Sequence, residues 1–276
     1  MPGARSRSYL LTDPGQRKAE AERLDRQARL LFPFEREALA QHGIAKGRTL
    51  LDLGCGQGSF LALIAEAFPG LRCVGVDRHQ ELLEEARARP GIAAVASCDL
   101  ANPQALLRVL REHRPDSVLC RFVLQHMSPA EGHSLLMTLA EHVSRHPLQV
   151  VLADVDGTSS FFDPPSALLA EAREGLGQLQ ARLGGDRKIG ARLPLLLQEA
   201  GFDGVETSRV RISSDALGFA SWWAAFGSLL CAGLRSRPSA QEALEEWARD
   251  PATATRWRAG FDVCFASACS LEPTHA

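Results

Sequence analysis

The stretch LLDLGCGQGSF at 50–60 constrains the fold of this chain more than any other. An apolar run that carries one acid, Asp52, leads into three alternating glycines, and an apolar, helix-compatible segment follows up to Phe68. This order predicts a buried strand, a tight turn and the first turn of a helix. Glycine has no Cβ, so a ligand can approach the backbone closely, and we expect the free amides of the helix start to face it.

A second acid lies where a nucleotide-binding βαβ unit requires one. The apolar run 71–76 ends on Asp77, about 20 residues after the glycine turn. An acid at the tip of the second strand binds ribose hydroxyls in such units. A glycine turn without a ligand does not explain Asp52 and Asp77 together.

The spacing of the glycines separates two cofactor classes. A dinucleotide fingerprint, G-x-G-x-x-G/A, would place Ser59 in the third glycine position, so an NAD-dependent dehydrogenase is the poorer match. The observed G-x-G-x-G, with Asp52 two residues before the first glycine, closely resembles motif I of the class I S-adenosylmethionine (SAM) methyltransferases. The resemblance covers roughly residues 45–212 and the last strand, and the flanks are similar to a subgroup of bacterial small-molecule methyltransferases.

Strand and helix patterns alternate along the chain, which predicts an α/β fold with a doubly wound sheet. The strands are expected at 49–53, 71–76, 92–97, 117–120, 148–155, 205–212 and 260–271. The resemblance implies seven mainly parallel strands in the order 3-2-1-4-5-7-6, with the seventh antiparallel. We expect an N-terminal helical cap at 1–44, broken at Pro33, a SAM-binding Rossmann-like domain at 45–212 with a helical insertion at about 161–187, a helical lid at 213–258, and a final strand and tail at 259–276.

Composition excludes several classes of function. The chain is 45% hydrophobic and 23% charged with a net charge of −2, so nucleic acid and anionic membranes are not expected partners. The longest apolar run, 222–234, is too short to span a bilayer, and no secretory signal is recognised, so a cytoplasmic location is expected. The seven cysteines show no metal-ligand spacing, so no metal is expected. The oligomeric state stays open.

The resemblance also implies which residues hold SAM. The glycine turn would contact the methionyl part, Asp77 the ribose, and Asp99 with Leu100 the adenine. The cofactor-binding residues expected are Tyr9, Asp52, Gly54, Cys55, Gly56, Gly58, Asp77, Arg78, Asp99, Leu100, Arg121, Phe122 and Gln125. Three of them have an alternative interpretation: Asp99 as a turn cap, Arg121 as a surface salt bridge, and Phe122 as core.

Methyl transfer needs aligned reactants and excluded water, and a hydroxyl or carbon nucleophile also needs a base. His126 is the first candidate because imidazole titrates near neutral pH, although a histidine at a helix start is equally often structural. Asp154 and Asp156, after the fifth strand, are the second candidates.

The acceptor surface is expected from residues 9–23, 161–187 and 213–257. Trp222, Trp223 and Phe226 form either helical core or the wall of an apolar acceptor pocket. The sequence thus predicts a SAM-dependent methyltransferase of a small-molecule metabolite, with specialised metabolism as one setting. Two alternatives stay open. One is attack elsewhere on the sulfonium, by cyclisation or 3-amino-3-carboxypropyl transfer with release of 5′-methylthioadenosine. The other is a catalytically silent SAM-binding module.

Overall fold

Seven strands form one sheet in the order β3-β2-β1-β4-β5-β8-β7, in a computed structural model that describes residues 14–271. The strands are β1 Thr49–Leu53, β2 Arg72–Asp77, β3 Ile92–Ser97, β4 Ser117–Arg121, β5 Gln149–Asp163, β7 Glu206–Ser213 and β8 Arg258–Ala268. The first five pair in parallel, whereas β8 runs antiparallel to both β5 and β7. The predicted fold class, strand order and antiparallel last strand are therefore confirmed. Two short strands, β6 Phe202–Asp203 and β9 Ser270–Leu271, pair separately.

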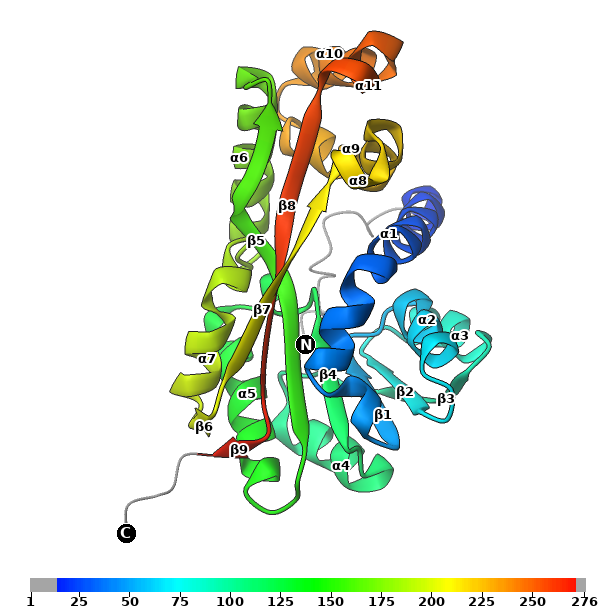
Figure 1. Ribbon diagram of the computed structural model, residues 1–276, viewed down its shortest axis with the longest axis vertical. Coiled ribbons are helices and arrows are strands. Elements are labelled where there is room, and N and C mark those ends of the chain that lie inside the picture. The colour runs from blue at the N-terminus through cyan, green and yellow to red at the C-terminus, as the bar shows by residue number, and fades with distance from the viewer. Residues whose placement is uncertain (1–13, 272–276) are drawn as a thin grey trace.

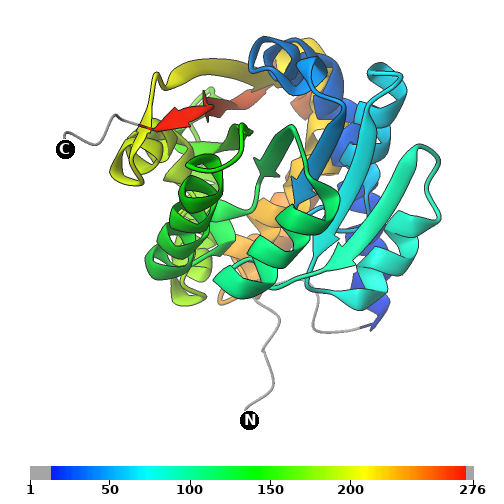
Figure 2. The same ribbon diagram turned by 90° about the horizontal axis from the view of Figure 1, so that it is seen from below.

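Helices cover both faces of the sheet (Figure 2). They are α1 Pro14–Gln41, α2 Ser59–Ala67, α3 Gln80–Arg87, α4 Pro103–His113, α5 Pro129–Val143, α6 Ala167–Arg182, α7 Leu193–Glu199, α8 Ser214–Leu217, α9 Phe219–Gly233, α10 Pro238–Arg249 and α11 Pro251–Arg256, with short 3₁₀ turns η1 Ile44–Lys46, η2 Leu124–His126 and η3 Ile189–Arg192. Alternate strand residues face opposite sides. Leu50 packs in the core formed with α1, α2, α6 and α9, whereas Leu51 packs in the core formed with α4, α5 and α7.

The N-terminal helix does not break where the sequence predicts. Pro33 lies inside the continuous helix α1, although proline removes a helical hydrogen bond and costs about 3 kcal/mol. Leu31 and Leu39 on either side of it are fully buried in the core against the sheet. Tertiary packing of this face outweighs the local penalty, which the residue pattern alone did not reveal.

Strand β5 is also longer than predicted, because it continues past residue 155 to Asp163. Its outer part pairs with the start of β8, after an irregularity between Asp156 and Phe161. Together β5 and β8 form an arm beyond the carboxyl end of the sheet, and α6 and α9 to α11 gather around it (Figure 1).

Helices α6 and α9 approach each other very closely on this arm. A Cβ on Gly175 would lie 2.0 Å from the carbonyl oxygen of Gly233, so only glycine permits this contact. The first part of the predicted helical lid is divided at Gly218 into α8 and α9. Within the described residues, no helix combines the length and apolar character that crossing a bilayer requires.

Candidate active site

A cavity of about 340 Å³ opens at the carboxyl ends of β1, β2 and β4, beneath α1 and α9. Ligand sites of doubly wound sheets lie at this edge. Most of the predicted site residues line it: Asp52, Gly54, Cys55, Gly56, Asp77, Arg78, Asp99, Leu100, Arg121, Phe122, Gln125 and His126. Gly58, Asp154 and Asp156 do not line it, and Tyr9 lies outside the described residues.

The three glycines of the turn have different roles. All three have a positive φ, but a Cβ on Gly54 would lie 2.4 Å from Val123 Cγ2, and one on Gly58 would lie 2.7 Å from Ile92 Cδ1. Those two glycines permit close packing inside the protein. A Cβ on Gly56 would meet no atom within 4 Å, and Gly56 lines the cavity. Gly56 is therefore the position where a ligand can lie against bare backbone.

Three amides of the turn, those of Gly54, Cys55 and Gly56, are bonded within the protein. The N–H groups of Gly54 and Cys55 both donate to Val76 O, at 2.7 and 2.9 Å, and Gly56 N–H donates to Asp77 Oδ2 at 3.0 Å. The turn thus offers a ligand close approach more than hydrogen-bond donors. Phosphate sites at helix starts depend on such donors.

Asp77, half-buried at the end of β2, joins the turn to helix α3. Its Oδ2 accepts from Gly56 N–H and its Oδ1 accepts from His79 N–H at 2.9 Å. A carboxylate oxygen can accept more than one hydrogen bond, so both oxygens retain capacity for a ligand in the cavity. Asp99 is exposed and its Oδ1 accepts from Ala101 N–H at 3.1 Å, the turn-capping role that the sequence left open.

Arg121 forms a buried ion pair, not a surface one. Its Nε and Nη2 donate to the two carboxylate oxygens of Glu35 at 2.6 and 2.7 Å, and the Glu35 side chain is fully buried. The guanidinium also lies 3.8 and 3.9 Å from the ring centroids of Phe60 and Phe122. Phe122 has a φ of 57°, a strained value for a bulky residue and one typical of functional sites. The ion pair fixes α1 over the end of β4.

Asp52 is buried at the base of the cavity. Its pKa is raised to about 7, chiefly by burial and also by the charge of Asp77, while the Arg121 guanidinium opposes both effects. A buried carboxyl group with such a raised pKa is stabilised strongly by a cation that binds beside it, because the new positive charge favours the ionised form.

His126, at the end of η2, lines the cavity. Its pKa is lowered to about 4, chiefly by burial and also by the positive charges of Arg187, Arg23 and Arg78. The imidazole is therefore neutral at pH 7 and can accept a proton, but it is a weak base.

Asp154 and Asp156 are structural in their contacts. Asp154 accepts from the backbone N–H groups of Gln125 and Val155, at 3.0 and 2.9 Å, and so holds η2 against β5. Asp156 accepts from Thr158 N–H at 2.9 Å and pairs with Arg209 at 3.6 Å. Since neither lines the cavity, the prediction that they act on a substrate has no geometric support.

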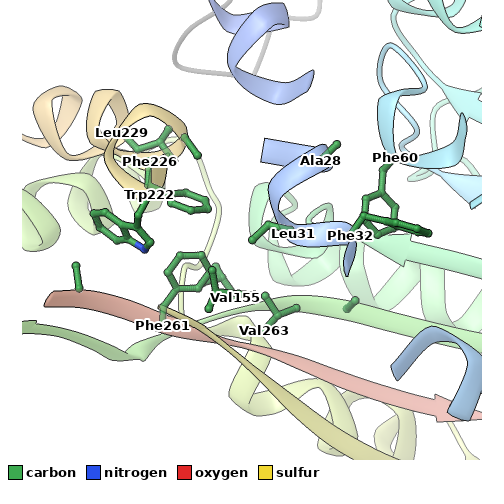
Figure 3. Close-up of a cluster of buried hydrophobic side chains, with 14 of the residues drawn as sticks. Ala28, Leu31, Phe32, Phe60, Val155, Trp222, Phe226, Leu229, Phe261 and Val263 are labelled. Atoms are coloured by element: carbon green, nitrogen blue, oxygen red, sulfur yellow. The ribbon is translucent and has the colours of Figure 1, made fainter. Parts of the chain in front are cut away.

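The two tryptophans of α9 belong to the core. Trp222 lies 5.4 Å from Phe226 between ring centroids, and Trp223 lies 5.6 Å from Trp247. Of the predicted aromatic group, Phe226 alone lines the cavity, and it projects from α9 towards Phe261 on β8 (Figure 3). Phe226 and Leu229, one to two turns beyond Trp222 on the same helix, therefore form the apolar wall of the cavity at α9.

Sequence reasoning placed part of the acceptor surface at residues 9–23 but did not predict how α1 is held across the glycine turn. Gln57, in the glycine turn, donates from Nε2 to Ala21 O at 2.8 Å and to Asp25 Oδ1 at 3.0 Å. Arg89 Nη2 donates to the same Asp25 oxygen at 2.6 Å. These bonds hold α1 across the turn, so that α1 also lines the cavity. The polar residues at 22–27 were the signal, and they matched the flanking pattern of the methyltransferase subgroup.

Comparison with known proteins agrees with this geometry. A family model described as a methyltransferase domain matches residues 51–146. A trans-aconitate 2-methyltransferase of Azoarcus sp. (strain BH72) is 32% identical over 186 residues, 62% of this chain and 63% of the relative. One of Methylobacterium radiotolerans is 38% identical over 89 residues, 32% of each. The chain thus covers less than two thirds of the length of these relatives.

Solved structures share the fold. The plantazolicin methyltransferase BamL, in a complex with a desmethyl substrate analogue and SAH, superposes with a TM-score of 0.51 over 93% of both chains at 15% identity. An O-methyltransferase family protein from Burkholderia thailandensis gives 0.50 over 93% of this chain and 60% of its own, at 13% identity. No group of acidic, histidine or cysteine side chains in the described residues could hold a metal ion. The chain thus contains a methyltransferase domain at residues 51–146, and its sheet has the strand order expected of the class I SAM-dependent methyltransferases.

Proposed function

We propose that the chain binds SAM in this cavity and transfers its methyl group to a small molecule. One observation carries the choice of cofactor: the amides of Gly54, Cys55 and Gly56 are all bonded within the protein, while Gly56 is open to the cavity. A dinucleotide needs amide donors for its pyrophosphate. SAM has no phosphate, so it can lie against the bare backbone at Gly56 without such donors.

The remaining polar groups fit the parts of SAM. Asp77 has unused acceptor capacity for the ribose hydroxyls, and the buried Asp52 suits the ammonium group of the methionyl part. Asp99 and Leu100, side by side at the cavity wall, suit the adenine amine and ring. Cys55 borders the same wall as a thiol whose pKa is raised by burial, so it is an inert neighbour and not a nucleophile.

When bound, SAM supplies an electrophilic methyl group on a sulfonium that is already a good leaving group. The protein therefore aligns the acceptor and excludes water. Phe122, Phe226 and Phe261 exclude water from the reacting region. His126, neutral at pH 7, accepts a proton where the acceptor reacts through a hydroxyl or a carbon atom.

The acceptor is a small-molecule metabolite, and specialised metabolism is one setting for it. Two of the relatives are named for trans-aconitate, so trans-aconitate is the first compound to test. The cavity lies between the sheet edge and α9, and helices α8 to α11 act as its lid.

The test is to incubate the purified protein with SAM, alone and with acceptors, and to identify the nucleoside that forms. S-adenosylhomocysteine that appears only with an acceptor supports methyl transfer. Release of 5′-methylthioadenosine without an acceptor, above the spontaneous background, would instead show attack on the methionyl chain. Calorimetry with SAM and NAD provides the binding control, and tighter binding of NAD would refute the choice of cofactor.

A further inference from the structure

One cation that lines the cavity has no partner within the described part of the protein. Arg187, half-buried in the segment after α6, forms no ion pair and its side chain makes no hydrogen bond to a described residue. An arginine carries its charge at any physiological pH and offers several donors in a planar fork. A half-buried guanidinium without a partner is therefore a site for an anion.

The other buried cations of the cavity are already neutralised. Arg23 donates to both oxygens of Glu20 at 2.7 Å and to Ala225 O at 3.1 Å. Arg121 is paired with Glu35 in the same bidentate manner. Arg78 is exposed, at the outer rim beside Asp77. Among the described residues that line the cavity, Arg187 is thus the one partly buried positive charge without an ion pair, and it is available to bind a ligand.

The backbone of Arg187 is held firmly, so its side chain starts from a fixed point. Arg187 O accepts from Gly157 N–H on β5 at 2.8 Å, and the preceding residue, Asp186, donates its N–H to Gln125 O on η2 at 2.9 Å. The charge of Arg187 lowers the pKa of both His126 and Asp154, so the guanidinium lies close to η2 and to the end of β5. The methyl-transfer region is expected beside these elements.

Next to this charge the cavity wall is apolar. Val155 follows Asp154 directly on β5, and the wall continues through Phe226, Leu229 and Phe261 to Leu24 and Ala28 on α1. A ligand that reaches Arg187 therefore has one charged contact and several hydrocarbon contacts.

We propose that Arg187 binds the acidic group of an acceptor that is otherwise apolar, such as a medium-chain or aryl-substituted monocarboxylic acid. The inference rests on the proposed function and specifies its substrate class. It also separates this chain from relatives named for a tricarboxylate: second and third carboxylates would lie against hydrocarbon or near Asp52 and Glu20, with no free buried cation to receive them.

The electrostatics of the pair are favourable. SAM carries a net positive charge at neutral pH, so a monoanionic acceptor is attracted by the cofactor as well as by Arg187. One charge-assisted contact contributes about 1.5–3 kcal/mol, which corresponds to roughly a 10-fold to 150-fold gain in affinity over a neutral isostere.

The experiment measures acceptor binding by calorimetry on the protein saturated with S-adenosylhomocysteine. Octanoate and 3-phenylpropanoate are compared with their primary amides and with trans-aconitate. We expect both acids to bind at least 10-fold more tightly than their amides and than trans-aconitate. Arg187→Met should remove the preference for acid over amide, and Arg187→Lys should retain part of it. The control, Arg192→Met, removes an exposed arginine that pairs with Asp186 outside the cavity and should change neither value.

Three results would overturn the inference: equal binding of acids and amides by the wild type, tighter binding of trans-aconitate, or a loss of SAM affinity in Arg187→Met that equals the loss of acid affinity. The last would assign Arg187 to the cofactor's carboxylate. These failures are distinct from failure of the proposed function, which would appear as absent SAM binding or absent S-adenosylhomocysteine with every acceptor. A variant that does not fold is recognised by its melting curve, and Arg187→Lys then carries the comparison.

Discussion

Replacing Asp77 with asparagine tests the cofactor site most directly. The two oxygens of Asp77 accept from Gly56 N–H at 3.0 Å and from His79 N–H at 2.9 Å, and their remaining capacity is assigned to the ribose hydroxyls. In Asp77→Asn one oxygen becomes an NH₂ group. That group faces either a backbone N–H or a ribose hydroxyl that had been a donor to the carboxylate.

Two losses follow, and they have different sizes. The ribose loses at least one charge-assisted hydrogen bond of about 1.5–3 kcal/mol, so the Kd for SAM should rise at least 10-fold. The fold loses a bond to one backbone amide, a cost of about 1–3 kcal/mol in the free energy of unfolding. Calorimetry with SAM and urea denaturation measure the two losses separately.

Asp116 provides the matched control. Its Oδ2 accepts from the backbone N–H groups of Arg48 and Thr49, both at 2.8 Å, at the opposite end of β1. Asp116→Asn should destabilise the fold to a similar extent and leave the Kd for SAM unchanged. If Asp77→Asn also leaves the Kd within a factor of two, then Asp77 serves only to hold the glycine turn, and the ribose contact is refuted.

Four further substitutions have definite expected outcomes. Gly56→Val should abolish SAM binding, measured by calorimetry, because its side chain would enter the cavity, whereas Gly54→Ala should chiefly lower the melting temperature because its Cβ would lie 2.4 Å from Val123 Cγ2. Glu35→Gln leaves the buried Arg121 charge unpaired and should cost about 3–5 kcal/mol in urea denaturation; a loss below 1 kcal/mol would show that the pair is not needed. For His126 the folded pKa of about 4 lies below the ordinary 6.5, so it contributes stability above pH 6.5 that is lost as the pH falls towards 4. His126→Gln should therefore lose less stability than the wild type between pH 7 and pH 5, and equal losses would contradict the low pKa.

The sheet could be predicted from the sequence because the strands, the glycine turn and the acids that follow strands are each recognised from neighbouring residues. The run at 50–60 has a single reasonable interpretation as strand, turn and helix, and the structure confirms it with β1 and α2. Element bounds that depend on distant packing could not be predicted. Pro33 is tolerated in α1 only because the face of that helix is buried against the sheet, and no neighbouring residue indicates this.

The site was predictable where a side chain follows directly from a strand end, and less so elsewhere. Asp52, Asp77, Asp99 and Arg121 belong to strands or to the turns that follow them, and all four line the cavity. The sequence could not show which of these side chains would form hydrogen bonds or ion pairs within the protein and which would remain available to a ligand. The partner of Arg121 is Glu35, 86 residues away on α1, and only the fold brings the two together.

Asp154 and Arg187 show why charge in a sequence is an ambiguous signal of function. Asp154 lies on β5, near where the sequence placed the end of that strand, yet its carboxylate accepts hydrogen bonds from two backbone amides and holds η2. Arg187 lies in an insertion with no recognisable motif, yet it lines the cavity and its side chain forms no ion pair or hydrogen bond with a described residue. A charged group becomes available to a ligand when the fold buries it without a directly paired opposite charge, and that condition depends on tertiary contacts alone. For this reason the acceptor end of the cavity, and not the cofactor end, is where the structure adds most to the sequence.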